Sequence, residues 1–394
     1  MPVTNLAGAD QFVLQAAISA YSDEAYTNAR KLSGTGIVGS NPDIDVNTET
    51  FIGQVRWYKP LNATINVASL TNAANGTGTT FASDYLTYIK TVRTHGATKV
   101  NMAQVVTQED GLAKIGRDFA ETRAQDEHNA ILSVLRGVAL SEMLNGAAAA
   151  SGATGLGGQT FDNDPTDKKY GFYVDLGSSK VVVDATATAQ GAARAEGFLQ
   201  AIGKAWKDYE SEYYYLVTSP EVVASLRSAN LVDQIVVTEG NVNFNTIFGG
   251  KFRLVQTRAN QGFSTAELAK VNTGAGVDIT GVKTSFIVLP GAIAMEALTV
   301  PDSVEIFRDG RAYNGGGATD IWHRWGYVAH PAGYNWKGAV DAFPTDATYG
   351  YAVEDTTPLA LTSVVSATLA STTGVWERKT NSALTLGILP VFHA

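Results

Sequence analysis

The N-terminal region contains a glycine pattern of the kind that binds phosphate. Gly34, Gly36 and Gly39 match the G-x-G-x-x-G fingerprint of dinucleotide-binding folds letter for letter. This fingerprint works only after a strand and at the start of a helix, where its glycines let the pyrophosphate reach the helix N-terminus. Here Ala-Arg-Lys-Leu-Ser at 29–33 precedes the glycines and Asn-Pro-Asp follows at 41–43. We therefore interpret the pattern as part of a flexible arm.

A second pattern, over residues 197–204, resembles the phosphate loop of nucleotide-binding proteins. Its glycine is one residue too early, and Ala205 stands where that loop requires Ser or Thr. Phe198, Ile202 and Trp206 follow helical spacing across the same stretch. The segment is therefore predicted to be an amphipathic helix without a nucleotide site.

Metal ligation would require clustered histidine, cysteine or carboxylate side chains. The histidines are His95, His128, His323, His330 and His393. No two are three or four residues apart, and the chain has no cysteine, so neither a helical ligand pair nor a thiolate site is predicted. His128 is expected at a solvated or interface position. His323 and His330 are seven residues apart, which would place them on opposite faces of a strand.

The acidic residues give no catalytic pattern either. Glu109-Asp110 and Asp126-Glu127 are adjacent pairs, which diverge on a helix and indicate a cap and a solvated face. No G-x-S-x-G nucleophile elbow is present. We predict no catalytic, cofactor-binding or metal-ligating residue, no cofactor, and a protein that is not an enzyme.

Composition limits the class of protein further. The chain has 394 residues, 45% hydrophobic and 17% charged, which is enough for a large core. The formal net charge of −9 argues against a dedicated nucleic-acid reader, which needs a basic surface. The first residues lack the basic and apolar regions of a secretory signal, and no apolar run is long enough to span a bilayer. We expect a soluble protein made inside the cell.

The segments that must position these residues change in character along the chain. Residues 1–50 have few apolar side chains beyond a helical stretch near 12–20, and they indicate an arm that must lie on another surface or stay mobile. Two strand-like runs follow, joined by a glycine-rich tip at 72–80, and they predict a long hairpin. Residues 107–145 predict one long helix with apolar ends and a polar middle, ended by Asn145-Gly146.

An α/β region comes next. Residues 213–218 predict a buried strand, and Ser219-Pro220-Glu221 then opens a helix with a cap, a first-turn proline and a first-turn acid. Further strands are predicted at 235–237, 252–255, 286–289, 304–307, 321–329 and 384–392. The runs at 304–307 and 321–329 are expected to be neighbours.

In this order, the segments resemble the major capsid proteins of tailed bacteriophages, which share the Hong Kong 97-like fold. Three stretches carry the resemblance: 85–138, which ends in Leu-Arg-Gly; 291–333, with Val-Glu-Ile-Phe-Arg-Asp at 304–309 and His-Pro-x-Gly at 330–333; and 375–379, Val-Trp-Glu-Arg-Lys. Together they span most of the chain beyond the arm.

The resemblance implies an α+β fold with five regions. These are an N-terminal arm (1–50), an extended hairpin loop (51–105), a peripheral domain (106–175 and 292–345) with a spine helix at 107–145, an axial domain (176–291), and a C-terminal segment (346–394) that returns to the core.

It also implies a structural protein that assembles as pentamers and hexamers into an icosahedral shell around double-stranded DNA, without sequence-specific binding. The expected location is the virion capsid, after assembly in the host bacterial cytoplasm. Because the arm starts at Met1, a separate scaffolding protein is expected, together with a portal, a decoration protein as a further option, and no membrane.

Some relatives cross-link a lysine to an asparagine; Lys59, Lys90 and Lys99 lie in the matching region, and we expect no such cross-link. The alternatives are an encapsulin-type protein compartment, an α+β hydrolase, and a surface adhesin, which the Thr- and Ser-rich C-terminal residues favour and the missing export signal opposes.

Overall fold

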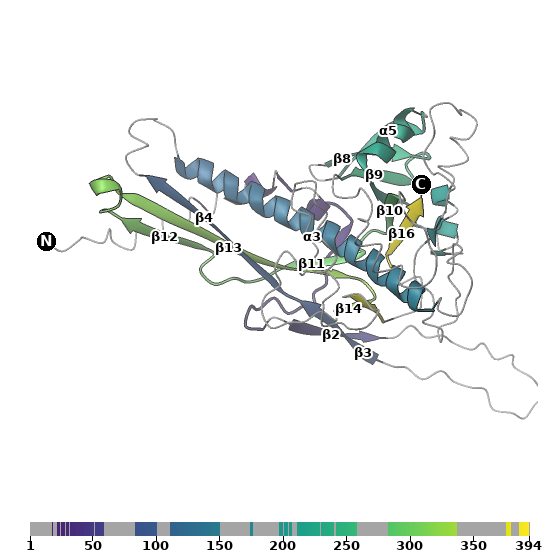
Figure 1. The fold of residues 1–394 in the computed structure, drawn as a ribbon, viewed down its shortest axis with the longest axis horizontal. Coiled ribbons are helices and arrows are strands. Elements are labelled where there is room, and N and C mark those ends of the chain that lie inside the picture. The colour runs from purple at the N-terminus through teal and green to yellow at the C-terminus, as the bar shows by residue number, and fades with distance from the viewer. Residues whose placement is uncertain are drawn as a thin grey trace, which may run out of the picture.

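The fold of the chain comes from a computed structural model. It describes residues 18, 22–23, 25–27, 29–30, 32–50, 52–58, 83–100, 111–149, 174–175, 197–199, 201–203, 205–206, 211–228, 230–239, 242–257, 283–336, 376–379 and 386–393. These residues form the α+β fold that was predicted. One long helix runs beside a sheet of long strands, and a second sheet lies toward one end of that helix (Figure 1).

The long helix is α3, Gly111–Ala149. At 1.5 Å per residue its 39 residues extend about 58 Å. Phe119, Ile131 and Leu135 are fully buried along it. The predicted start at 107–110 lies outside the described residues. The predicted stop at Asn145-Gly146 is wrong, because the helix continues through the alanines at 147–149, the strongest helix formers.

We call the first sheet the long sheet. Its strands are β1 Val38–Gly39, β4 Thr91–Val100, β11 Ile293–Ala297, β12 Val304–Asp309 and β13 Ala318–Pro331. β13 is the central strand: β4 pairs with one edge, and β12 and β11 pair with the other, all antiparallel. The predicted neighbourhood of β12 and β13 is confirmed. Helix α3 covers one face, where Phe119 packs with Ile306 and Ile321.

We call the second sheet the compact sheet. Its order is β5 (Val174–Asp175), β16 (Ile388–His393), β10 (Lys283–Val288), β6 (Tyr214–Thr218), β9 (Phe252–Gln256), β8 (Val242–Ile247) and β7 (Val232–Glu239). The strands predicted at 213–218, 252–255 and 286–289 are confirmed as β6, β9 and β10. Strand β16 brings residues near the C-terminus beside β10.

The predicted cap of the helix in the α/β region is also confirmed. Helix α5, Pro220–Ser228, begins after Ser219, whose Oγ accepts a hydrogen bond of 3.5 Å from the backbone N–H of Val222. Val222, Val223 and Leu226 are buried on its inner face. The helix predicted around Phe198 and Trp206 is present in the described residues between 197 and 206.

The base of the predicted hairpin is present. β2, Ile52–Tyr58, pairs antiparallel with β3, Ser83–Ile89. The glycine-rich tip at 72–80 lies outside the described residues. The next strand, β4, leaves the hairpin and joins the long sheet. Its Ala97 packs with Ile321 of β13, and its Val92 packs in a second small apolar cluster that contains Val328 of β13. A further strand pair, β14 (Tyr334–Trp336) and β15 (Trp376–Arg378), packs beside β3.

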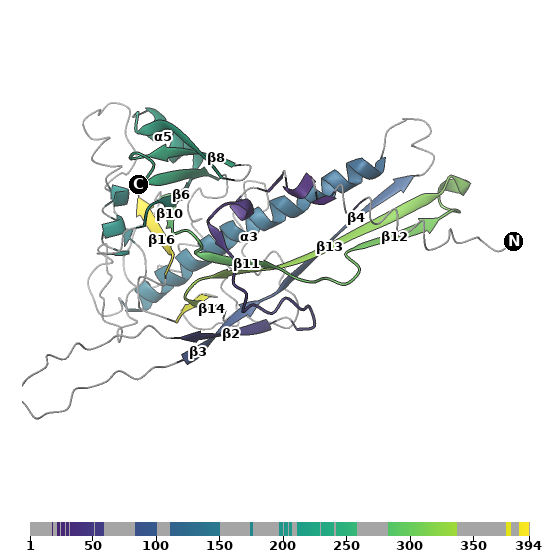
Figure 2. The same cartoon turned by 180° about the vertical axis from the view of Figure 1, so that it is seen from behind.

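The described part of the arm is not free, which corrects the flexible-arm interpretation of the glycine pattern. Residues 32–34 form a 3-10 turn (η1, Leu32–Gly34), β1 pairs with β11, and Leu32, Ile37 and Ile44 are buried. Figure 2 shows this segment lying across α3 and β11. The glycines permit close approach: a Cβ on Gly36 would lie 2.6 Å from the Tyr215 hydroxyl.

Candidate functional site

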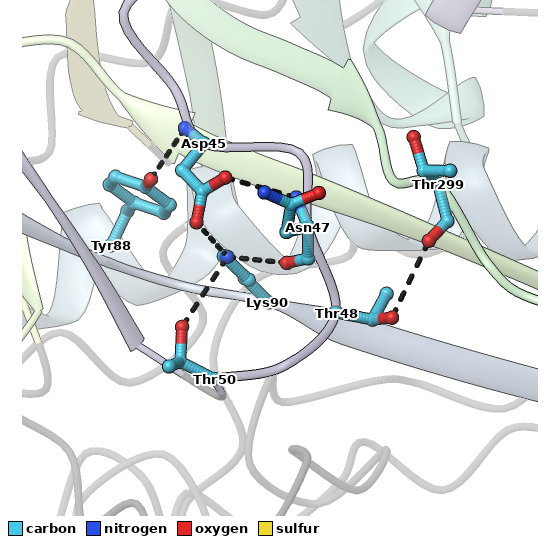
Figure 3. A network of polar contacts seen from close by, with 7 residues as sticks. All are labelled: Asp45, Asn47, Thr48, Thr50, Tyr88, Lys90 and Thr299. Atoms are coloured by element: carbon cyan, nitrogen blue, oxygen red, sulfur yellow. Dashed lines mark hydrogen bonds and ion pairs between the residues drawn. The ribbon is translucent and has the colours of Figure 1, made fainter.

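The polar side chains that are candidates for a functional role lie where the arm, helix α3 and the two sheets meet. The first junction is at Lys90, between β3 and β4 (Figure 3). Its side chain is 0% exposed. The ammonium donates to Asp45 Oδ2 at 2.8 Å, to the Asn47 carbonyl at 2.5 Å and to Thr50 Oγ1 at 3.5 Å. The backbone N–H of Asp45 donates to the Tyr88 hydroxyl at 2.7 Å.

This junction joins three parts of the chain. Residues 45–50 lead from the arm into β2, Tyr88 belongs to β3, and Lys90 directly precedes β4. The Asp45 carboxylate is half-exposed, and the hydrogen bond from Lys90, followed by that from the Asn47 backbone, lowers its pKa. Since the three oxygens converge on one buried cation, the arrangement fixes the base of the hairpin against the long sheet.

The three lysines considered for a cross-link to asparagine have different surroundings in the structure. Lys90 is surrounded by oxygens of its own chain. Lys99 lies on β4 opposite Thr319 of β13, and Lys59 lies outside the described residues. That no cross-link forms stays a prediction.

The second junction is the polar middle of α3, which was predicted to be solvated. That prediction is wrong for Asp126 and Glu127. The Trp325 indole N–H donates to Asp126 Oδ2 at 3.0 Å, and Arg93 lies 3.5 Å from Asp126 Oδ1. Glu127 is buried and accepts hydrogen bonds from Tyr26 Oη at 2.5 Å and Arg123 Nε at 3.2 Å.

Tyr26 is a residue that the sequence did not single out. Its ring lies 4.1 Å from the Arg123 guanidinium carbon, which adds a cation–π contact. Burial, and then the charge of Glu127, raise the pKa of the Tyr26 hydroxyl. The only sequence signal was the spacing of Arg123 and Glu127 at i, i+4, which is common on exposed helices as well.

The third group consists of the histidines of β13. His323 stacks on Phe119 of α3 with ring centroids 5.4 Å apart, and on Trp325 at 5.3 Å. His330 contacts the rings of Tyr88 at 6.4 Å and Trp376 at 5.5 Å. His323 thus lies on the face of β13 that packs on Phe119 of α3, whereas His330 packs on Tyr88 and Trp376, in line with the prediction that the two histidines face opposite sides of a strand. Burial lowers the pKa of each to about 4, which keeps both neutral at pH 7.

The remaining histidines lie on three different elements. His95 is opposite His323 in the β4–β13 pair, His128 is half-buried on α3, and His393 lies at the end of β16. Across the described residues, no three His, Asp or Glu side chains are grouped so that they could hold a metal ion. Within the same residues, no helix is both long enough and apolar enough to cross a membrane.

A fourth junction lies at the C-terminal end of α3. Glu142 is fully buried, and its Oε2 lies 3.5 Å from Arg378 Nη1 of β15. Tyr334 of β14 is also fully buried there, and burial followed by the charge of Glu142 raises its pKa. An ion pair removed from water in this way links the helix to the strand pair β14–β15.

The outer face of the long sheet carries exposed aromatic side chains. Ile306 and Ile321 face α3, so their neighbours Phe307 and Trp322 point to the opposite side of the pleated strands. Phe307 is 54% exposed and Trp322 is 42% exposed. Trp322 lies over Gly96, where a Cβ would come within 2.8 Å of the indole ring.

Among known proteins, the chain is similar to solved structures of bacteriophage capsids. No family model and no curated protein matches it. The mature capsid of bacteriophage PhiM1 matches at 12% identity over 76% of this chain and 83% of that chain, with a TM-score of 0.42. The head of Helicobacter pylori bacteriophage KHP40 matches at 8% identity over 91% of this chain and 89% of that chain, with a TM-score of 0.44. The capsid of Ralstonia phage GP4 matches at 12% identity over 75% of this chain and 83% of that chain, with a TM-score of 0.39.

These matches are to structures of phage capsids and a phage head, each at a TM-score below 0.5.

Proposed function

We propose that this protein is the major capsid protein of a tailed bacteriophage, a structural subunit and not an enzyme. The observation that carries the proposal is the outer face of the long sheet, where Phe307 of β12 and Trp322 of β13 remain exposed. A sheet face with large exposed aromatics is typical of a protein–protein interface. The elongated form of the subunit (Figure 1) favours contacts with several neighbouring copies over a single pairing.

The proposed assembly follows the resemblance. Pentamers and hexamers of the chain would form an icosahedral shell around double-stranded DNA, assembled in the bacterial cytoplasm with a scaffolding protein and a portal. The arm (1–50), hairpin loop (51–105), peripheral domain (106–175, 292–345), axial domain (176–291) and C-terminal segment (346–394) are proposed as its regions. Ring-forming contacts of this kind are heterologous, so different surfaces of the subunit meet.

The test is assembly. The chain expressed alone or with its scaffolding protein should sediment as large particles that appear as closed shells in negative-stain micrographs. Trp322→Ser should reduce the particle yield by about tenfold or more, since a central interface aromatic contributes about 2 kcal/mol or more. Trp322→Phe, which keeps an aromatic surface, is the matched control. Only small monodisperse species under every condition would contradict the proposal.

The content of the particles separates the alternatives. Nuclease-protected DNA inside particles from infected cells supports the capsid role. Protein cargo in place of nucleic acid would instead indicate an encapsulin-type compartment, and turnover by a monomer would indicate the α+β hydrolase.

A further inference from the structure

The chain passes between its two sheets through a four-residue joint, residues 289–292. Strand β10 of the compact sheet ends at Val288, and β11 of the long sheet begins at Ile293. The backbone turns at Gly291, where φ is +69°, a value that favours glycine. The N–H of Leu289 donates to the Gly387 carbonyl at 2.8 Å, so the C-terminal strand supports the joint from one side.

The arm supports the joint from another side through residues 36–41, which we call the clasp. The Gly36 carbonyl accepts a hydrogen bond of 2.7 Å from the N–H of Gly291, the residue at which the joint turns. Val38 and Gly39 then pair in parallel with Ile293 and Ala294 of β11.

The far end of the clasp is also tied to the long sheet. The side chain of Ser40 and the backbone N–H of Asn41 both donate to Oε1 of Glu296, each at 2.6 Å. Glu296 belongs to β11, so one carboxylate of the long sheet fixes two successive residues of the clasp.

The near end of the clasp is tied to the compact sheet by another carboxylate, that of Glu239 at the end of β7. Its Oε2 accepts hydrogen bonds from the Gly36 N–H at 3.3 Å and from the Tyr215 hydroxyl at 2.5 Å. Arg253 of β9 forms an ion pair with the same carboxylate, and its guanidinium lies 3.5 Å over the Tyr213 ring. Glu239 therefore connects the clasp to three strands of the compact sheet.

The fit of the clasp depends on two glycines. A Cβ on Gly36 would lie 2.6 Å from the Tyr215 hydroxyl, and a Cβ on Gly39 would lie 3.1 Å from the Gly291 Cα. A side chain at Gly36 would require the clasp or Tyr215 to shift, and one at Gly39 would press on the backbone of the joint. The same glycines that match a nucleotide fingerprint thus serve a close contact between backbones.

We propose that the clasp is a conformational device that sets the angle between the two sheets when it is docked and lets that angle change when it is released. Glu239 is the residue that holds the clasp docked, because its carboxylate accepts the hydrogen bond from the Gly36 N–H and so ties the clasp to the compact sheet. The proposal rests on the proposed function, in which one subunit serves in both pentamers and hexamers and therefore meets its neighbours at more than one angle.

The test uses the unassembled subunit, so that it does not depend on shell formation. The chain has no cysteine, so Ser225→Cys on α5 and Ser303→Cys before β12 allow two spin labels to be attached, one beside each sheet. With the clasp docked, the distance distribution should be narrow. Gly36→Ala should broaden it and increase hydrogen exchange at the Gly291 and Ile293 amides by about tenfold. The control is Gly310→Ala, where a Cβ would meet nothing within 4 Å.

Glu239→Gln is the second variant, and it keeps the shape of the side chain while removing its charge. It should broaden the same distribution while strands β6 and β10 keep their exchange protection. An unchanged distribution in both variants would overturn the proposal, and so would a simultaneous loss of protection across both sheets. If the clasp behaves as expected but no particle ever forms, the proposed function fails and the device stands.

Discussion

The hydroxyl of Tyr26 lies 2.5 Å from Oε2 of Glu127, although 101 residues separate them in the chain. Glu127 is buried in the middle of α3, where Arg123 supplies its counter-charge from one helical turn away. The contact attaches the arm to the helix at the point where the sequence is most polar. A buried carboxylate of this kind requires both partners, because an unmet hydrogen-bonding site in the interior is costly.

Tyr26→Phe is therefore expected to release this part of the arm. The substitution keeps the ring and removes one hydrogen bond to a buried charged group, so the free energy of unfolding should fall by about 1–3 kcal/mol. Limited proteolysis should cut the arm faster than in the unchanged protein. Tyr313→Phe, on an exposed ring, is the control. Equal proteolysis rates in the two variants would argue that the contact contributes nothing.

The Lys90 junction predicts an asymmetry between its two charged partners. Asp45→Ala leaves a fully buried ammonium without its counter-charge, whereas Lys90→Met leaves a half-exposed carboxylate that water can solvate. Asp45→Ala should therefore lower the free energy of unfolding by about 1–3 kcal/mol, and Lys90→Met by less. Chemical denaturation measures both, with the exposed Asp43→Ala as control. The reverse order would contradict this account of the junction.

The same junction predicts a loss of stability in acid. The pKa of Asp45 is lower in the folded protein than in the unfolded chain, so its contribution is present above the unfolded value near 3.8 and is lost as pH falls through the folded value. Asp45→Asn should remove this component from the pH dependence of the thermal midpoint below about pH 4. A curve identical to that of the unchanged protein would count against it.

His330 predicts a separate pH dependence at milder acidity. Its pKa is about 4 when folded against 6.5 when free, so the unfolded chain binds the extra proton and stability falls as pH drops from 6.5 to about 4. The full difference corresponds to about 3 kcal/mol. His330→Phe keeps the contacts with Tyr88 and Trp376 and should flatten this slope while leaving stability at pH 7 nearly unchanged. Denaturation at pH 7 and pH 4.5 measures it, and an unaltered slope would refute it.

The ion pair of Glu142 and Arg378 predicts the largest cost. Arg378→Met leaves the fully buried carboxylate without its cation, which should cost about 3–5 kcal/mol. Adding Glu142→Gln should recover part of that loss. The neighbouring Lys379→Met is the matched control, because its ammonium lies 3.9 Å from a partly exposed Asp84 and such pairs contribute about 0–1 kcal/mol. Similar losses in Arg378→Met and Lys379→Met would contradict the assignment.

Much of the fold follows from local patterns in the sequence. The apolar spacing across Ile131, Leu135 and Val138 predicts the long helix, and Ser219 marks the start of α5 correctly, because both signals act within a few residues. The C-terminal end of α3 was placed too early, since the helix propensity of three alanines outweighs the Asn-Gly stop.

The candidate sites were less predictable. The sequence predicts a solvated face for Asp126 and Glu127, because no residue near them in the chain indicates that Trp325 and Tyr26 cover them. The sequence also does not predict that β4 belongs to the long sheet. Its pairing depends on β13, which lies more than two hundred residues further along the chain.

By itself, the sequence determined the fold class: an α+β chain with a long helix and a pair of strands that precedes it. Only the tertiary structure decided what the polar and glycine residues do. Gly36 and Gly39 lie in the clasp, where Gly36 accepts a hydrogen bond from Gly291, and Lys90 lies at the centre of a junction of hydrogen bonds. The physical reason is range: propensity and periodicity act between near neighbours, whereas buried charges and close backbone contacts take their meaning from segments that meet only in the folded chain.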